Sequence, residues 1–251
     1  MRDRPALIAV SHGTADPAGQ ERITALARAV RTRTPAEVLL THVDVQSPPV
    51  GEVVAALPPG RAAVVVPVLL SAGYHVKVDL REAAGGLPVA GALGPDERLV
   101  EVLARRALGS GFVRGHHRVV LAAAGSTDAG AVADCRAVAA RVAARLGTEV
   151  TDAYLSAARP GVATAVGTAC RQDPARPVLV LSYLLAPGYF QSRLVAEAAA
   201  AGAAATTAPL LGESGPVPVE LADLVVSRYR ATVEGCSIPG RTARGPTASR
   251  C

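Results

Sequence analysis

Residues 6–14 read ALIAVSHGT, an unbroken apolar run that ends in a short polar loop. Three more apolar runs follow, at residues 38–45, 62–70 and 88–93, and helical patterns separate them. Between residues 18 and 33, for instance, apolar side chains recur every three or four positions, and Pro48-Pro49 opens a second helix through Leu57. Continuous apolar strands that alternate with helices predict an α/β fold, with a parallel sheet covered on both faces.

The second half of the chain repeats the first at an offset of 112 residues. Residues 118–126 read RVVLAAAGS, so that Gly13 aligns with Gly125, and Glu37-Val38 likewise aligns with Glu149-Val150. After a three-residue insertion the offset becomes 115, and Gly73-Tyr74 aligns with Gly188-Tyr189. We therefore expect an internal duplication: similar domains at residues 1–115 and 116–234, followed by a disordered tail at 235–251.

Composition excludes several classes of protein. Half of the 251 residues are hydrophobic but only 3% are aromatic, so alanine, valine and leucine must fill the cores. The net charge of +5 comes almost entirely from arginine, since Lys77 is the only lysine. Coding bias explains this composition most simply, although arginine also suits carboxylate ligands. No zinc-finger spacing or basic helix interleaved with aromatics indicates a nucleic-acid partner.

The four cysteines lie far apart and form no CxxC pair, which argues against a disulfide framework or a metal cluster. The first apolar run is too short for a signal peptide. The alanine-rich stretch at residues 194–211 carries Glu197 with several threonines and glycines, which is unlike a membrane span. We expect a cytoplasmic protein.

Three metal-ligand residue types fall where the first three strands end. His12 follows the first strand directly, Asp44 ends the second, and His75 lies just past the third. Because ligands bind at the carboxyl ends of parallel strands, three separate loops bring two imidazoles and one carboxylate to one edge. This thiolate-free set suits Fe(II), Co(II) or Ni(II), and a neutral imidazole also accepts protons at neutral pH.

Each of these residues alone has a simpler explanation. A histidine after a strand commonly serves as a loop hydrogen-bonder, and Asp44 could cap the following helix. We expect His42 to pack or to face solvent, and His116-His117 to form a solvated linker. The repeat favours the functional reading, because His12, Asp44 and His75 align with Ala124, Ser156 and Phe190 while scaffold residues persist. The three polar residues disappear together, as expected for one site kept in one half.

At these residues the sequence resembles the sirohydrochlorin chelatases, the class II tetrapyrrole chelatases that include cobaltochelatases and ferrochelatases. The resemblance lies in residues 11–17 (SHGTADP), in the segment 44–48, and in residues 67–79, which read PVLLSAGYHVKVD. It covers about 230 residues, and it implies two Rossmann-like domains around a cleft and no ATP requirement.

The resemblance also implies functional residues. His12 and His75 would be the essential catalytic and metal-binding pair, and Asp44, where many relatives carry glutamate, would assist the metal. The loops around the histidines and two tyrosines would contact the macrocycle: Ser11, Gly13, Ser71, Ala72, Gly73, Tyr74 and Tyr189. Edge packing explains the tyrosines equally well. Asp79 would orient His75 from behind, or simply begin a helix.

These inferences favour an enzyme that inserts Fe²⁺ into sirohydrochlorin for siroheme synthesis, with no permanently bound cofactor and a divalent metal (Fe²⁺, Co²⁺ or Ni²⁺) as substrate. Cobalt insertion for cobalamin synthesis is the first alternative, and a non-catalytic carrier of metal or tetrapyrrole is the second. A phosphate-binding loop at residues 11–14 is a weaker hypothesis, because no glycine-rich phosphate motif follows the first strand. We expect a monomer with pseudo-twofold halves and neither a nucleic-acid nor a membrane partner.

Overall fold

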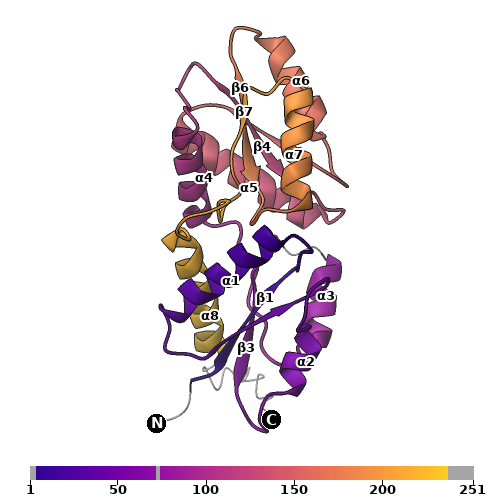
Figure 1. The fold of residues 1–251 in the computed structure, drawn as a ribbon, viewed down its shortest axis with the longest axis vertical. Helices are drawn as coiled ribbons and strands as arrows, with labels where there is room; N and C mark the ends of the chain where they lie inside the picture. The colour runs from indigo at the N-terminus through magenta and orange to yellow at the C-terminus, as the bar shows by residue number, and fades with distance from the viewer. Residues whose placement is uncertain (1–3, 72–73, 237–251) are drawn as a thin grey trace, which may run out of the picture.

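The computed structural model describes residues 4–71 and 74–236, which form two α/β lobes (Figure 1). The first sheet has the order β2-β1-β3 and the second the order β5-β4-β6-β7, with all pairs parallel. The elements of the first half are β1 (Ala6–Ser11), α1 (Pro17–Arg31), β2 (Val38–His42), α2 (Val50–Ala55), β3 (Ala63–Pro67), α3 (Tyr74–Ala83) and α4 (Glu97–Gly109). Those of the second half are β4 (Arg118–Ala123), α5 (Ala129–Leu146), β5 (Val150–Tyr154), α6 (Val162–Gln172), β6 (Val178–Tyr183), α7 (Tyr189–Ala200), β7 (Ala205–Thr206) and α8 (Val219–Cys236).

Strand register confirms the predicted duplication. In the first sheet Leu7 pairs with Val38, and in the second sheet the residues 112 positions later, Val119 and Val150, pair in the same way. The helices that follow also begin alike, because the carboxylates of Asp16 and Asp128 accept hydrogen bonds from the first backbone N–H groups of α1 and α5. The predicted Rossmann-like fold with two similar halves is therefore correct.

The loops after β1 and β4 share an unusual backbone. Gly13 and Gly125 have φ of +95° and +93°, and a Cβ added to either would overlap a carbonyl oxygen, that of Asp44 or of Ser156. These positions require glycine because the opposing loop passes directly against the Cα atom. Val45 and Ala157 in the opposing loops likewise share positive φ values, of 66° and 59°.

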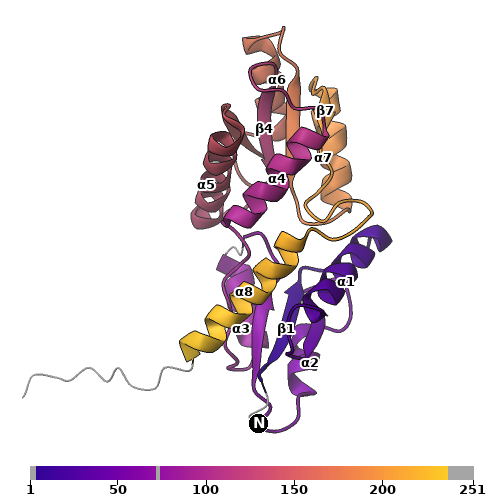
Figure 2. The same cartoon turned by 90° about the vertical axis from the view of Figure 1, so that its left-hand side faces the viewer.

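The last helix of each half packs on the sheet of the other half. Helix α4 packs on α5 and β6 of the second half, whereas α8 returns to pack on α1 and β3 of the first (Figures 1 and 2). A boundary at residue 115 therefore divides the repeat in sequence but not the packed units in space. The cause lies in the apolar faces of the two helices, which are buried against the sheet of the opposite half.

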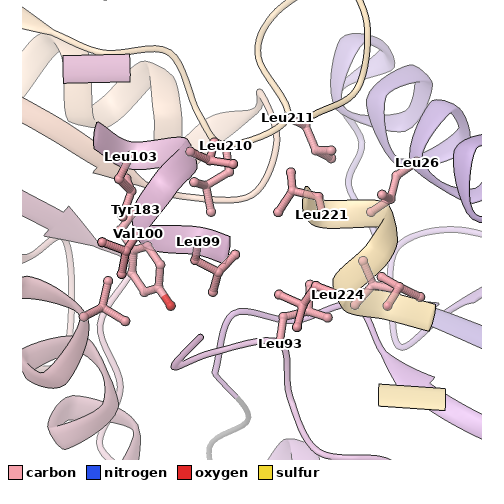
Figure 3. Packing of buried hydrophobic residues seen from close by; sticks show 14 of the residues in the cluster. Leu26, Leu93, Leu99, Val100, Leu103, Tyr183, Leu210, Leu211, Leu221 and Leu224 are labelled. Atoms are coloured by element: carbon pink, nitrogen blue, oxygen red, sulfur yellow. The ribbon is translucent and has the colours of Figure 1, made fainter. Parts of the chain in front are cut away.

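The two exchanged helices share one apolar core that crosses the molecule. Figure 3 shows Leu99 and Leu103 of α4 beside Leu210, and Leu221 of α8 beside Leu26 of α1. All five side chains are at most 2% exposed. Complete burial of a leucine stabilises the fold by about 2 kcal/mol, so this cluster fixes the position of one half against the other.

Charged groups stabilise the segment at residues 92–98, where the chain passes from the first sheet to α4. Arg228 of α8 donates hydrogen bonds to the carbonyl oxygens of Ala92 and Leu93, both at 2.8 Å. Asp96 caps α4 and pairs with Arg98, which lowers the pKa of that carboxyl; Arg228, 3.5 Å away, lowers it further. The chain that leaves the first sheet is thus anchored where it crosses to the second half.

Some boundaries differ from the sequence-based expectation. The expected fourth strand at residues 88–93 is wrong: only an isolated bridge joins Val65 to Val89, and the chain then turns to hydrogen-bond Leu69 and Leu70. Proline at position 88 supplies no N–H to a ladder. Gly235 and Cys236 belong to α8, while residues 237–251 of the expected tail lie outside the described residues. No helix in the described ranges is long and apolar enough to cross a membrane.

We expect Gly125→Ala to destabilise the protein far more than Gly215→Ala. Both positions have positive φ, of 93° and 77°, but an added Cβ meets the Ser156 carbonyl in the first case and open space in the second. The conformational cost alone is about 1 kcal/mol, and the overlap at Gly125 forces the backbone to move as well. Urea unfolding of both variants measures the difference; equal losses would contradict the close approach of these loops.

Candidate functional site

The carboxyl ends of both sheets meet at one cavity of about 420 Å³. The first half contributes the loop after β1 (residues 11–14), Val45, and the segment 68–71 after β3. The second half contributes the loop after β4 (residues 123–126), Tyr154 at the end of β5, and the segment 183–191 after β6. The site is therefore built from equivalent strand ends of the two halves, which face one another.

Backbone contacts hold the His12 loop against the Asp44 loop. The N–H of Asp44 donates to the carbonyl oxygen of His12 at 3.0 Å, and the N–H of Thr14 donates to Oε1 of Gln46 at 2.9 Å. His12 is exposed and lines the cavity. Asp44, two residues after β2, is also exposed, and its Oδ1 accepts the N–H of Val45 at 2.7 Å. The structure thus brings these two loops to the same sheet edge, as the sequence predicts.

The third predicted ligand lies on α3. His75 is the second residue of this helix, and its side chain and that of Tyr74 lie outside the described part of the structure, as do Ala72 and Gly73. Ser71, just before that gap, lines the cavity. Asp79 follows His75 by one helical turn and is exposed. The described residues contain no group of three or more histidine, cysteine or acidic side chains able to hold a metal, and this finding does not include His75.

The opposite side of the cavity is apolar and aromatic. Tyr189 and Phe190 begin α7 with 72% and 40% of their surface exposed, and their rings meet edge to face at 5.6 Å. The loop before them presses on the first half, because a Cβ added to Gly19 of α1 would lie 2.6 Å from the carbonyl oxygen of Pro187. Phe190 is the second residue of α7, as His75 is of α3.

Sequence reasoning missed a buried polar pair beneath the His12 loop. Ser11 Oγ lies 2.7 Å from Nδ1 of His42, and the two residues are 2% and 4% exposed. Burial lowers the pKa of His42, so its imidazole is neutral at pH 7. His42 therefore packs inside and does not face solvent. Its period-two spacing from Val38 and Leu40 was the signal for burial, but the partner on β1 was not visible from sequence.

The residues that replace this buried pair in the second half have different chemistry. Tyr154, at the position of His42, donates its hydroxyl to Asp152 at 2.7 Å. Cys135 and Tyr183 also line the cavity, and burial raises the pKa of both, that of Cys135 to about 11. The thiol therefore stays protonated at neutral pH, which is the form that does not ligate metals. Among the described residues that line the cavity, none is an arginine or a lysine.

A family model named CbiX matches the chain twice, over residues 6–109 and 118–231. The chain belongs to the CbiX family. The two matches coincide with the two halves of the duplication, and they confirm the resemblance drawn from residues 11–17 and 67–79. No curated protein sequence matches the chain.

Solved structures share this fold. The chain is similar to SirB from Bacillus subtilis with Fe³⁺, at 20% identity and a TM-score of 0.78, covering 92% of this chain and 98% of that one. It is also similar to the sirohydrochlorin chelatase SirB from Bacillus subtilis subspecies spizizenii in complex with cobalt, at 18% identity and a TM-score of 0.72, covering 92% and 96%. A multi-domain protein from Deinococcus radiodurans with structural similarity to chelatases matches at 20% identity and a TM-score of 0.67, covering 90% and 54%. These likenesses establish that the two-lobed fold is that of SirB.

We expect the thiol of Cys135 to resist alkylation at pH 8. A pKa of about 11 leaves roughly a hundredfold less thiolate than the ordinary value of 9.0 does, because each pH unit changes the fraction tenfold. Iodoacetamide labelling followed by peptide mass spectrometry should modify Cys135 far more slowly than it does in urea. Labelling at the same rate in native and unfolded protein would show that this side of the cavity is open to solvent.

Proposed function

We propose that this protein is a sirohydrochlorin chelatase, which inserts a divalent metal, preferably Fe²⁺, into the macrocycle bound between its two halves. The observation that carries the proposal is the cavity itself. A flat ligand can enter between a side that carries His12 and a side that carries Tyr189 and Phe190. Membership of the CbiX family supports the same reaction, and the similar SirB proteins are described with Fe³⁺ and with cobalt.

In this proposal residues 1–115 act on the metal and residues 116–234 hold the macrocycle. His12 and His75 bind the incoming metal and accept the two protons that leave the pyrrole nitrogens. An imidazole nitrogen cannot ligate metal and accept a proton at the same time, so proton transfer follows release of the metal from that nitrogen. Asp44, whose loop is hydrogen-bonded to that of His12, supplies negative charge that favours a dication.

The composition of the cavity bears on how the macrocycle binds. Sirohydrochlorin carries eight carboxylates, but the described lining residues supply hydroxyl groups (Thr14, Ser71, Ser126) and apolar surface rather than cationic side chains. The carboxylate arms therefore extend into solvent or toward arginines outside the cavity, and the flat ring lies on the apolar side. Tyr189, with most of its surface exposed beside the opening, is suited to stack on the ring face.

The proposed ligands select weakly among divalent metals, because two imidazoles and a carboxylate bind iron, cobalt and nickel alike. Insertion rates for Fe²⁺, Co²⁺ and Ni²⁺, compared anaerobically at equal free metal, test the preference for iron. If insertion is fastest with Co²⁺, the proposed reaction becomes cobalt insertion for cobalamin synthesis. Stoichiometric binding of macrocycle and metal without turnover would instead make the protein a carrier. Both sides of the cavity come from one chain, so we propose that a monomer is active.

We expect His12→Ala and His75→Ala each to lower kcat/KM for metal insertion by about 100-fold or more, because each removes a metal ligand and a proton acceptor. Both residues lie in or beside loops, so the free energy of unfolding should change by only about 0.5 kcal/mol. Metallation followed by absorbance, together with urea unfolding, measures both effects.

The matched control is His116→Ala, because His116 is exposed in the segment that joins the halves. This variant should insert metal at the wild-type rate. Wild-type activity in a folded His12→Ala or His75→Ala protein would rule out the two-histidine mechanism.

We expect Asp44→Ala to raise the metal concentration needed for half-maximal rate by about tenfold while changing the maximal rate little, because the carboxylate assists metal capture. Ser156→Ala is the control, since Ser156 holds the equivalent position in the second half, and it should leave both parameters unchanged. A fall in maximal rate alone would make Asp44 a proton acceptor and not a metal ligand.

A further inference from the structure

A second cavity, of about 290 Å³, lies in the second half away from the chelatase cavity. It sits beneath α6, beside the first residues of β4 and the turn that enters β5, and it shares no lining residue with the first cavity. Its lining is polar. The side chains that matter below are Arg118, Glu149, Thr164, Thr168, Gln172 and Arg176.

Two partly buried arginines converge on this cavity with donors left over. Arg118 donates from Nη1 to Oε1 of Gln172 at 2.9 Å, and Arg176 donates from Nη2 to the carbonyl oxygen of His117 at 2.8 Å. The Nε atoms of both are buried and have no hydrogen-bond partner in the described part of the protein. Asp173 lies 4.0 Å from Nε of Arg176, too far for a hydrogen bond. Buried donors without partners are costly, so the protein leaves both guanidinium groups incompletely hydrogen-bonded.

The first half of the same chain shows how the equivalent residues pair with one another. Strand register makes Ala6 the equivalent of Arg118, because each opens the central strand and pairs with the first residue of the third. The repeat also aligns Glu37 with Glu149 and Arg61 with Arg176. In the first half Arg61 pairs with Glu37 at 3.2 Å. In the second half no ion pair joins Arg176 to Glu149 among the described residues, and Arg118 adds another positive charge beside it.

We propose that this cavity is a binding site for a small oxyanion, a carboxylate or a phosphate, held by Arg118 and Arg176. A guanidinium presents a planar pair of donors that matches two oxygens of either group. The hydroxyls of Thr164 and Thr168, one turn apart on α6, add neutral donors on the same side. Glu149 also lines the cavity, and its carboxylate opposes the binding of additional negative charge.

Isothermal titration of the metal-free protein with sodium phosphate and with citrate, each against sodium chloride at matched ionic strength, tests the proposal. We expect saturable binding of at least one anion, with a dissociation constant of about 1 mM or below. Preference for phosphate or for citrate identifies the class of ligand, and either result supports the site. Heat indistinguishable from chloride up to about 10 mM for both anions overturns it.

The decisive variant is Arg118→Ala, which installs the residue of the first half. It should weaken anion binding at least tenfold, because one of the two guanidinium groups is lost. Thr168→Val keeps both charges and should weaken binding about threefold, and it serves as the second variant if Arg118→Ala does not fold.

Arg230→Ala is the charge-matched control, since Arg230 is exposed on α8, which packs on the first half. It should bind the anion as wild type does. Equal weakening by Arg118→Ala and Arg230→Ala would mean that net charge alone attracts the anion, and the site would be rejected. These titrations contain neither metal nor macrocycle, so their failure leaves the chelatase proposal untouched, and failure of metal insertion leaves this site untouched.

Discussion

The packing of α4 on the second sheet and of α8 on the first holds the carboxyl ends of the two sheets face to face. Each helix belongs to one half in sequence and buries its apolar side against the other half. The core that the two helices share includes Leu99, Leu210 and Leu221 (Figure 3). Ligands of parallel sheets bind beyond the carboxyl ends of the strands. The exchange therefore converts two such edges into the two sides of a single cavity.

Duplication explains why the two sides are alike in backbone and unlike in chemistry. The loops at Gly13 and Gly125 have the same conformation, because in each the opposing loop leaves no room for a side chain. The side chains beside them diverge: Ser11 and His42 form a buried polar pair in the first half, whereas Ala123 and Tyr154 replace them in the second. One scaffold thus presents His12 and hydroxyl groups on one side of the cavity, and three tyrosines with Phe190 on the other.

The divergence also reaches the far ends of the strands. Glu37 pairs with Arg61 in the first half, whereas a cavity lies at the equivalent corner of the second half, where Arg118 stands in place of Ala6. Comparison of the two halves therefore shows which contacts one of them has lost. The ion pair between Arg61 and Glu37 has no counterpart between Arg176 and Glu149 among the described residues.

Much of this architecture follows from local sequence. The apolar run at residues 6–10, the helical spacing between residues 18 and 33 and the repeat at Gly125 were enough to predict two parallel α/β halves and the edge where His12 and Asp44 lie. The exchange of α4 and α8 was not predictable, because an amphipathic pattern shows which face of a helix is buried but not which sheet covers it. The bond between Ser11 and His42 depends on strand register, and the apolar run at residues 88–93 pairs only at Val89.

The most direct test of this account is a crystal structure of the protein with metal-free sirohydrochlorin bound. We predict that the macrocycle lies in the cavity between the halves, with the pyrrole nitrogens toward His12 and one ring face on the side that carries Tyr189. The same orientation should persist in His12→Ala, because the second half holds the ring. A macrocycle bound outside this cavity, or with its pyrrole nitrogens directed at Gly125 and Phe190, would contradict the assignment of metal chemistry to the first half.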